Sequence, residues 1–156
     1  MSDITTFLTY NDQAEEAARF YTSIFPNSRV TRVTRCPDIE GLPAAGSVMV
    51  VEFELMGRPF VALNGGPQFS FSQGISISVQ CDTQAEVDEY WAKLAEEGTE
   101  VACGWVTDKF GVSWQINPKL LMDMITDDDP EKAKKAMQAM MDMVKIDSEA
   151  LKKAWE

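Results

Sequence analysis

Carboxylates, hydroxyls, amides and thiols are the side chains that could do chemistry here, because the 156-residue sequence contains no histidine. The lack of histidine excludes Ser-His-Asp and Cys-His nucleophiles and every metal site that needs imidazole. Cys36, Cys81 and Cys103 are an odd number of cysteines without metal-binding spacing. They suit free thiols in a reducing cytoplasm. Residue types alone therefore give no catalytic residue and no metal ligand.

Glu52 and Glu54 are the one pair of carboxylates whose spacing suggests acid–base work. Residues two apart on a strand share a face, and paired carboxylates can divide the roles of acid and base. The same spacing also suits the solvent-facing side of an antiparallel strand. We favour this second interpretation, because the sequence places no partner near either carboxylate.

Two rows of polar side chains offer a site for an organic ligand. In both segments apolar and polar residues alternate, and a period of two predicts half-buried strands. Each polar row either borders a cavity or simply faces water. In a cavity, hydroxyl and amide groups would orient a neutral or cationic organic molecule. The rows are Ser76, Ser78 and Gln80, and Ser113, Gln115 and Asn117 after the turn at 108–111.

The elements that must position these rows repeat at an offset of 71 residues. Residues 4–10 and 75–81 have strand patterns, and a helix follows each, with Asp12 and Thr83 as expected N-caps of capping boxes. Gln-Ala-Glu recurs at 13–15 and 84–86, and the hairpin at 47–64 corresponds to that at 101–117. Because about 60 residues bury little surface alone, we expect the two α+β halves to share one sheet system.

Length and charge limit the function classes further. The chain suits one domain, no stretch approaches the ~20 apolar residues of a membrane helix, and the N-terminus lacks a signal-peptide pattern. We therefore expect a cytoplasmic protein with no membrane partner. The formal net charge of −11 opposes binding to phosphate backbones, so we expect no nucleic-acid partner.

Residues 119–156 lie outside the repeat and predict a C-terminal helical extension. Asp129 and Pro130 start one helix, and Asp147 or Ser148 starts a short last helix. We expect the apolar stripe of the longer helix to pack on its own domain or on a dimer partner, rather than to act as an adaptable binding surface. The stripe is Ala133, Ala136, Met137, Met140, Met141 and Val144.

Three segments carry a family resemblance that covers roughly residues 4–118. The run Thr107-Asp108-Lys109-Phe110-Gly111-Val112-x-Trp114-x-Ile116-Asn117 resembles the closing hairpin of PhnB-like proteins, and residues 14–21 and 62–67 match the same group. These proteins belong to the glyoxalase/bleomycin-resistance/dioxygenase superfamily, also called vicinal oxygen chelate. The resemblance implies two βαβββ modules around a concave cavity, with repeats at about 4–65 and 75–118 in one domain of residues 1–118. It also implies a homodimer.

Metal-dependent members of this superfamily hold a divalent cation with side chains from four strands. The resemblance puts those positions at Thr5 or Thr6, near Ala62, near Ser76 and at Gln115. Two hydroxyls, a methyl group and an amide supply no charge for a cation. We therefore expect no metal and no other cofactor.

Together these observations predict metal-free binding of a small organic molecule in the cavity. The alternative is an enzyme of the same superfamily, either 3-demethylubiquinone methyltransferase-like or a metal-dependent lyase or dioxygenase with an unusual site. The sequence shows no glycine-rich strand-to-helix loop for a nucleotide-like methyl donor, and enzymatic activity stays open. The predicted ligand-binding residues are Thr5, Thr6, Ser76, Ser78, Ser113, Gln115 and Asn117.

Overall fold

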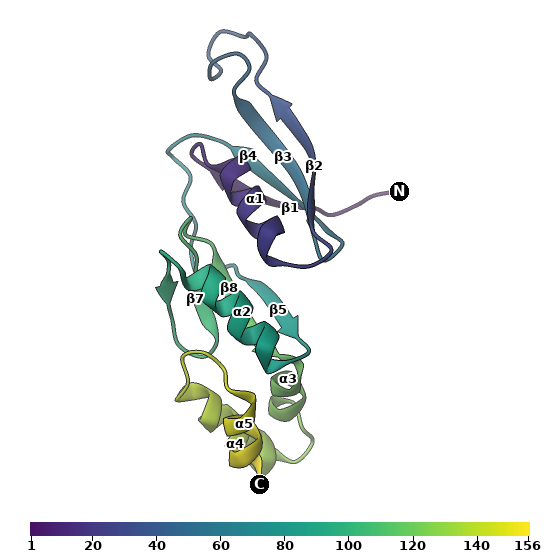
Figure 1. The fold of residues 1–156 in the computed structure, drawn as a ribbon, viewed down its shortest axis with the longest axis vertical. Coiled ribbons are helices and arrows are strands. Elements are labelled where there is room, and N and C mark those ends of the chain that lie inside the picture. The colour runs from purple at the N-terminus through teal and green to yellow at the C-terminus, as the bar shows by residue number, and fades with distance from the viewer. The chain divides into compact units, whose positions relative to one another are not determined.

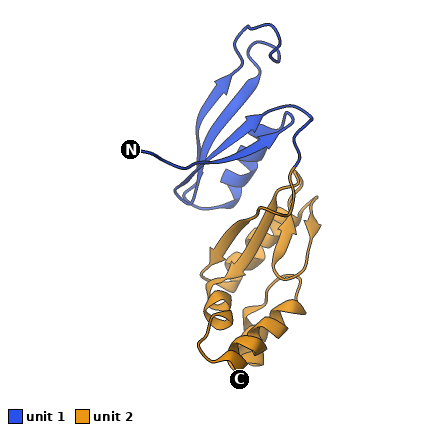
Figure 2. Cartoon of the chain, turned by 180° about the vertical axis from the view of Figure 1, so that it is seen from behind, with its two compact units in different colours: residues 1–70 blue, residues 71–156 orange.

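The computed structural model describes residues 1–156, which form two compact units, residues 1–70 and 71–156 (Figure 2). No helix in the chain is long and apolar enough to cross a membrane. The first unit contains β1 (Thr6–Tyr10), α1 (Ala14–Ile24), β2 (Arg29–Arg35), β3 (Val48–Leu55) and β4 (Arg58–Asn64). The second contains β5 (Ile77–Cys81), α2 (Gln84–Ala95), β6 (Thr99–Glu100), β7 (Trp105–Thr107), β8 (Ser113–Pro118), α3 (Lys119–Ile125), α4 (Pro130–Met141) and α5 (Ser148–Trp155) (Figure 1).

Each unit builds its own mixed four-stranded sheet, and the two sheets have the same topology. The strand orders are β1-β4-β3-β2 and β5-β8-β7-β6, with β1/β4 and β5/β8 parallel and the other pairs antiparallel. Both ends of β5 follow those of β1 by 71 residues. The predicted α+β fold of two βαβββ modules is thereby confirmed. Each sheet takes its strands from one module only, and the expectation that the two modules share one sheet system stays a prediction.

Helix α1 packs on one face of the first sheet through small residues that let the helix backbone approach closely. Ala14, Ala17 and Ala18 are fully buried, and Tyr21 lies over Phe53 with ring centroids 6.4 Å apart. The phenol groups of Tyr10 and Tyr21 are hydrogen-bonded at 3.2 Å. The partners on the sheet include Val51, Phe53, Leu55, Phe60 and Ala62, which alternate along β3 and β4 as a half-buried sheet requires.

A bulge in β2 explains why its sequence shows no clear apolar face. Val30 and Val33 stand three residues apart, which in a regular strand would put them on opposite faces. The register against β3 shifts between Val30 and Arg32, so one extra residue of β2 is accommodated there. Val30 then pairs with Phe53 and Val33 with Val51, both on the face toward α1.

The start of α1 differs from the prediction. Gln13, not Asp12, is the N-cap residue, and its side chain makes no capping bond. Instead the backbone amide of Ala14 donates to Oδ1 of Asn64, the last residue of β4, at 2.8 Å. The capping box of α2 forms as predicted, since the Glu86 amide donates to Thr83 Oγ1 and the Glu86 carboxylate accepts from Asp82 N.

Helix α2 covers one face of the second sheet. Val87, Tyr90, Trp91 and Leu94 are buried on it, and Trp91 Nε1 donates to the Glu100 carboxylate at 2.8 Å. After the end of α2, Glu97 takes the left-handed conformation, with φ of 59°, although a glycine, Gly98, follows it directly. Gly98 is required instead by close approach, since a Cβ there would lie 2.3 Å from the Thr107 carbonyl oxygen.

The C-terminal helices form a cluster of their own around five buried residues: Leu121, Met124, Ala136, Ile146 and Leu151. Asp129 and Asp147 cap α4 and α5 as predicted, whereas α3, which follows β8 directly, was not anticipated. The predicted apolar stripe of α4 is only partly right. Ala136 and Met140 face the cluster, but Met141 is 64% exposed, and Met137 and Val144 are also exposed.

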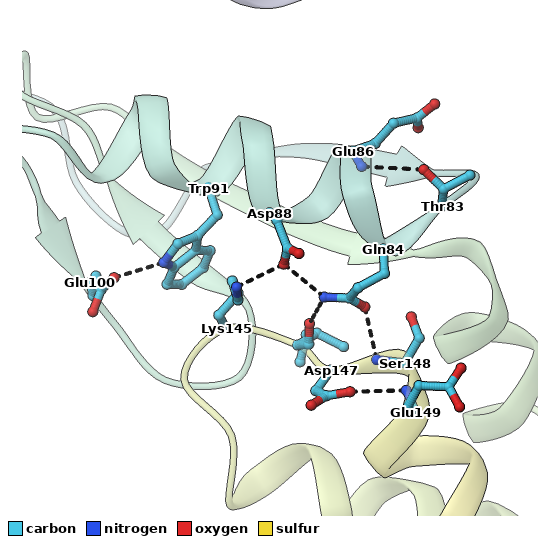
Figure 3. A network of polar contacts seen from close by, with 11 residues as sticks. Thr83, Gln84, Glu86, Asp88, Trp91, Glu100, Lys145, Asp147, Ser148 and Glu149 are labelled. Atoms are coloured by element: carbon cyan, nitrogen blue, oxygen red, sulfur yellow. Dashed lines mark hydrogen bonds and ion pairs between the residues drawn. The ribbon is translucent and has the colours of Figure 1, made fainter.

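The segment before α5 ties this cluster to α2 (Figure 3). Gln84 Nε2 donates to the carbonyl of Ile146 at 2.9 Å, and Gln84 Oε1 accepts from the amide of Ser148 at 2.8 Å. Lys145 pairs with Asp88 at 2.7 Å. The amides of Cys103 and Gly104 also donate to the carbonyls of Met143 and Val144. The extension is therefore hydrogen-bonded to the second module at two places: at α2, and at the two residues before β7.

Candidate functional site

The face of the second sheet opposite α2 carries both predicted polar rows. Register places Ser78 beside Gln115 and Gln80 beside Asn117, while Val79 pairs with Ile116 on the helix side. Strand β7 adds Trp105 next to Gln115 and Thr107 next to Ser113. Ser76, Ser78, Ser113, Gln115 and Asn117 are thus brought onto one face by the adjacent strands β5 and β8.

Gln115 lies in the middle of this face and is held by a neighbouring strand. Its Nε2 donates to Ser76 Oγ at 2.8 Å, and Gln80 Nε2 donates to Ser78 Oγ at 3.0 Å. Gln115 is half-buried and Ser78 is exposed, whereas Ser113 and Asn117 are only 3% and 8% exposed. Within this row, Gln115 and Ser78 are the groups that a ligand reaches most directly.

The Asn117 side chain packs against the chain rather than facing open space. A Cβ at Gly104 would lie 2.5 Å from Asn117 Oδ1 and 3.0 Å from a side-chain carbon of Ile146. Gly104 has φ of 83°, which favours glycine in any case. Asn117 therefore borders the docked C-terminal segment, and Gly104 leaves room for both.

Asp108 organises the hairpin that presents Gln115. Its Oδ1 accepts from the amides of Phe110 and Val112 at 2.8 and 3.1 Å, and its Oδ2 accepts from Trp114 Nε1 at 2.8 Å. Gly111 closes the turn with φ of 93° and a bond to the Asp108 carbonyl. Because Trp114 is fully buried on the α2 side, the Asp108 bond fixes which face Gln115 occupies. The turn was predicted from the sequence, but this bond between turn and strand was not.

The candidate residues of the first unit, Thr5, Thr6 and Ala62, do not lie together on one face of their sheet. Thr6 shares its strand parity with Leu8 and Tyr10, which face α1, so Thr5 is the residue with the parity of the opposite face. Both threonines are exposed. Ala62 is fully buried on the α1 side, which gives it no access to a ligand on the opposite face.

A divalent metal does not fit the side chains at the positions implied by the superfamily. Thr6 and Ala62 lie on the α1 side of their sheet, and Gln115 and Ser76 are neutral groups bonded to each other. No group of three or more His, Cys, Asp or Glu side chains in the chain is arranged to hold a metal ion. Neutral hydroxyls and one amide do not offset the dehydration of such a cation.

Glu52 and Glu54 have partners that the sequence did not reveal. Glu54 pairs with Arg29 at 3.3 Å, and Glu52 pairs with Arg32 at 3.8 Å, each across the β2–β3 ladder. Cross-strand pairs of opposite charge of this kind stabilise a sheet surface. The structure thus supports the interpretation of these carboxylates as a surface ladder.

A pocket in the first unit was not anticipated by the sequence. It has a volume of about 980 Å³ and is lined by the turn before α1, the β2–β3 loop, the start of β3 and the end of β4. Three separate segments, within residues 11–16, 36–49 and 63–66, combine to form it, so no local pattern could have signalled it. The lining residues include Asp12, Glu15, Glu16, Cys36, Leu42, Val48, Leu63 and Asn64.

The thiols are free, and burial makes at least one of them inert. Desolvation, with Glu86 and Asp82 nearby, raises the pKa of Cys81 to about 12. Desolvation also raises the pKa of Tyr90, which contacts the same core. A buried thiol with a raised pKa forms very little thiolate at neutral pH and is therefore a poor nucleophile.

Comparison with known proteins gives the family. Residues 2–117 match the family model described as 3-demethylubiquinone-9 3-methyltransferase. A PhnB protein from Bacillus cereus has 34% identity and a TM-score of 0.69, with 75% of this chain and 99% of that chain covered. Protein PA1353 from Pseudomonas aeruginosa has 23% identity and a TM-score of 0.64, over 76% and 98% of the two chains.

A glyoxylase/bleomycin resistance protein/dioxygenase domain from Frankia sp. EAN1pec has 18% identity and a TM-score of 0.45, covering 73% of this chain and 89% of that one. A search among curated proteins found no match. The family match ends at Asn117, so the C-terminal helices lie outside it. The chain belongs to the PhnB-like 3-demethylubiquinone-9 3-methyltransferase family.

Proposed function

We propose that the protein binds a small organic molecule without a metal, on the polar face of the second sheet. The observation that carries this proposal is the hydrogen bond from Gln115 Nε2 to Ser76 Oγ at 2.8 Å. It uses a donor of the amide and orients the group, so that Gln115 Oε1 is a fixed acceptor beside the exposed Ser78. A preoriented amide loses little conformational freedom when it binds a ligand.

The chemistry of this face suits a neutral or cationic molecule with hydrogen-bond donors. The face offers hydroxyls of Ser76, Ser78 and Thr107, the Gln115 amide and the half-buried ring of Trp105. None of these groups carries a positive charge, which disfavours an anion as the ligand. Polar groups beside an aromatic wall are typical of sites for small organic molecules.

Native mass spectrometry of freshly purified protein tests the proposal by detecting any small molecule that co-purifies. Gln115→Ala should weaken the affinity about fivefold or more and thereby lower the bound fraction, because one hydrogen bond contributes ~1 kcal/mol. Gln138→Ala is the matched control, since Gln138 is an exposed amide on α4. Equal occupancy in wild type and Gln115→Ala would remove the site from this face.

Elemental analysis tests the metal-free part of the proposal. We expect no stoichiometric zinc, nickel, manganese or iron, because the donor set lacks charge. About one metal ion per chain in the wild type, and none in Gln115→Ala, would contradict the proposal that these neutral side chains bind no metal.

Methyl transfer is the second candidate, because the matched family carries that description. The chain's residues do not fit a nucleotide-like methyl donor of the glycine-rich kind. The turns before α1 and α2 contain no glycine, the first amide of α1 is occupied by Asn64, and Thr83 caps α2. Titration calorimetry with S-adenosylmethionine distinguishes the candidates: saturable binding would favour methyl transfer, and no heat would favour the binding protein.

We further propose that residues 1–118 act as one domain in a cytoplasmic homodimer. Three free thiols support a reducing compartment, and apolar groups such as Phe7 and Ile75 remain exposed in the single chain. Light scattering should give about twice the chain mass of 17.4 kDa. A mass of one chain at all concentrations tested would contradict the dimer.

A further inference from the structure

The pocket of the first unit is a second candidate site, independent of the polar face. Its rigidity comes from Asn64, which links three elements. Asn64 Oδ1 accepts from Ala14 N at the start of α1, and its Nδ2 donates to the Val48 carbonyl of β3 at 3.0 Å. Gly65 and Gly66 then continue the chain alongside β1, with bonds to the carbonyls of Tyr10 and Asn11. Asn64, Gly65 and Gly66 are therefore held in place by hydrogen bonds within the protein, so this part of the pocket lining is formed before a ligand binds.

Glycine at position 65 is required for this geometry. A Cβ there would lie 2.6 Å from a side-chain carbon of Thr9 and 2.8 Å from the ring of Phe69. Gly66 has φ of 98°, a conformation that other residues rarely adopt. The Gly65-Gly66 pair thus lets β4 leave the sheet close to β1 and line the pocket.

The β2–β3 loop also lines the pocket, and hydrogen bonds close this loop at its base. Cys36 N donates to the Ser47 carbonyl at 2.7 Å, and Gly46 N donates to the Cys36 carbonyl at 2.9 Å. Arg35 adds a bond to the Gly46 carbonyl at 3.0 Å. These bonds hold the ends of the loop, so that Leu42 and Pro43 line the pocket from a fixed base.

The charge on the pocket is negative and only partly compensated. Asp12, Glu15 and Glu16 line it, and no Lys or Arg does. Glu15 is paired with Arg19 at 2.9 Å, whereas Asp12 and Glu16 take part in no ion pair. Asp12 and Glu16 together carry two uncompensated negative charges. The N-terminus of α1 carries a partial positive charge of roughly one half, so the net charge at the pocket is about −1.5.

The rest of the lining decides which kind of cation fits. Leu42, Pro43, Val48, Met49 and Leu63 provide apolar surface, which a bare metal ion could not use. No cluster of three potential ligands is available for a metal in any case. The volume of about 980 Å³ suits a small organic molecule. An amine or guanidinium with an apolar body matches both the carboxylates and the apolar walls.

We propose that this pocket binds an organic cation, with Asp12 and Glu16 contacting the ammonium or guanidinium group and the apolar lining contacting its body. The site involves none of the residues of the polar face on the second sheet. Because the two carboxylates are exposed, their effect on affinity is moderate and decreases with added salt.

Nuclear magnetic resonance titration of the full-length protein tests this with two probes, 4-phenylbutylamine and 4-phenylbutanol. They share the apolar body and differ in charge. The amine should shift the backbone amide signals of Gly65, Gly66 and Cys36, and the alcohol should bind about tenfold more weakly, as expected for two partly exposed charge contacts. Equal affinity of the two probes, shifts confined to other residues, or no shift at about 10 mM amine would overturn the proposal.

Variants locate the effect. The double variant Asp12→Asn/Glu16→Gln should bind the amine about tenfold more weakly and the alcohol as before. Glu131→Gln is the matched control, because Glu131 also lies in the first turn of a helix, α4, but does not line this pocket. Gln115→Ala should leave amine binding unchanged, even if it abolishes binding at the polar face. Full amine affinity in the double variant, or loss of it in Gln115→Ala, would refute the site.

Discussion

Individual residues on β8 have different tasks although they are neighbours in sequence. Trp114 is fully buried and bonded to Asp108, while Gln115 is half-buried and bonded to Ser76. Consecutive residues of a strand point to opposite faces, so one supports the core and the next faces a ligand. Mutations at these adjacent positions should therefore separate folding from binding.

Trp114→Ala is expected to lower the free energy of unfolding by ~3–5 kcal/mol, because truncating a buried aromatic side chain leaves a void. Gln115→Ala should cost much less, since water can replace the partner of a half-buried amide. Thermal melts of the two variants, with and without a ligand found by screening, measure the difference. A harmless Trp114→Ala together with an unfolded Gln115→Ala would mean that β8 faces the opposite way.

Cys81 is expected to resist alkylation in the native protein. Its pKa is raised from 9.0 to about 12, so at pH 8 almost no thiolate is present, and the side chain is fully buried. Cys103 is half-buried and should be modified first by iodoacetamide. Peptide mass mapping after brief labelling at pH 8 gives the order. Labelling of Cys81 at the rate of an unfolded control would contradict the buried, protonated thiol.

At the scale of elements, the two modules use the same topology but start their helices differently. The α2 helix is capped locally by Thr83, whereas α1 depends on Asn64 from a distant strand. Gln13 and Gln84 occupy equivalent positions in the repeat, yet only Gln84 bonds to the C-terminal extension. In the second module the glutamine at the repeated position, Gln84, therefore holds the C-terminal helices, which have no counterpart in the first module.

Gln84→Ala should destabilise the docking of the extension by ~1–3 kcal/mol, because the Ile146 carbonyl and the Ser148 amide lose their partner. Gln13→Ala is the matched control and should change stability by less than ~0.5 kcal/mol. Hydrogen exchange of α5 amides under native conditions reports the docking directly. Equal exchange rates in both variants would show that the Gln84 bonds do not hold the extension.

At the scale of the whole molecule, the C-terminal helices are a structural addition to the family domain. They lie beyond the family match, pack around their own buried cluster, and bond to the chain next to Trp105 through Cys103 and Gly104. We therefore expect the extension to stabilise the second module.

Truncation after Pro118 should lower the free energy of unfolding by about 3 kcal/mol, which corresponds to roughly 6–12 °C in the melting temperature. The truncated chain loses the bonds at Gln84, Cys103 and Gly104, as well as the contact of Ile146 with Gly104. Calorimetry and light scattering of both forms measure stability and oligomeric state. Unchanged melting and unchanged mass would show that the extension is dispensable for both.

The sequence by itself determined the features that depend on local periodicity. Alternation of residues identified β5, β8 and the faces of their side chains, and the recurring pattern at an offset of 71 residues gave the two modules and their common topology. Caps made by adjacent residues, such as Thr83 and Asp147, were also predictable. These signals need no neighbour from elsewhere in the chain.

Only the tertiary structure decided the features that join distant segments. The Asn64 cap of α1 spans 50 residues, the bulge of β2 is set by its register against β3, and the carboxylates of β3 find arginines on another strand. The pocket is assembled from three separate segments of the chain. A period of 2 or 3.6 residues gives the direction of a side chain from its own backbone, but not what lies opposite, because partners across a sheet depend on register and chain path.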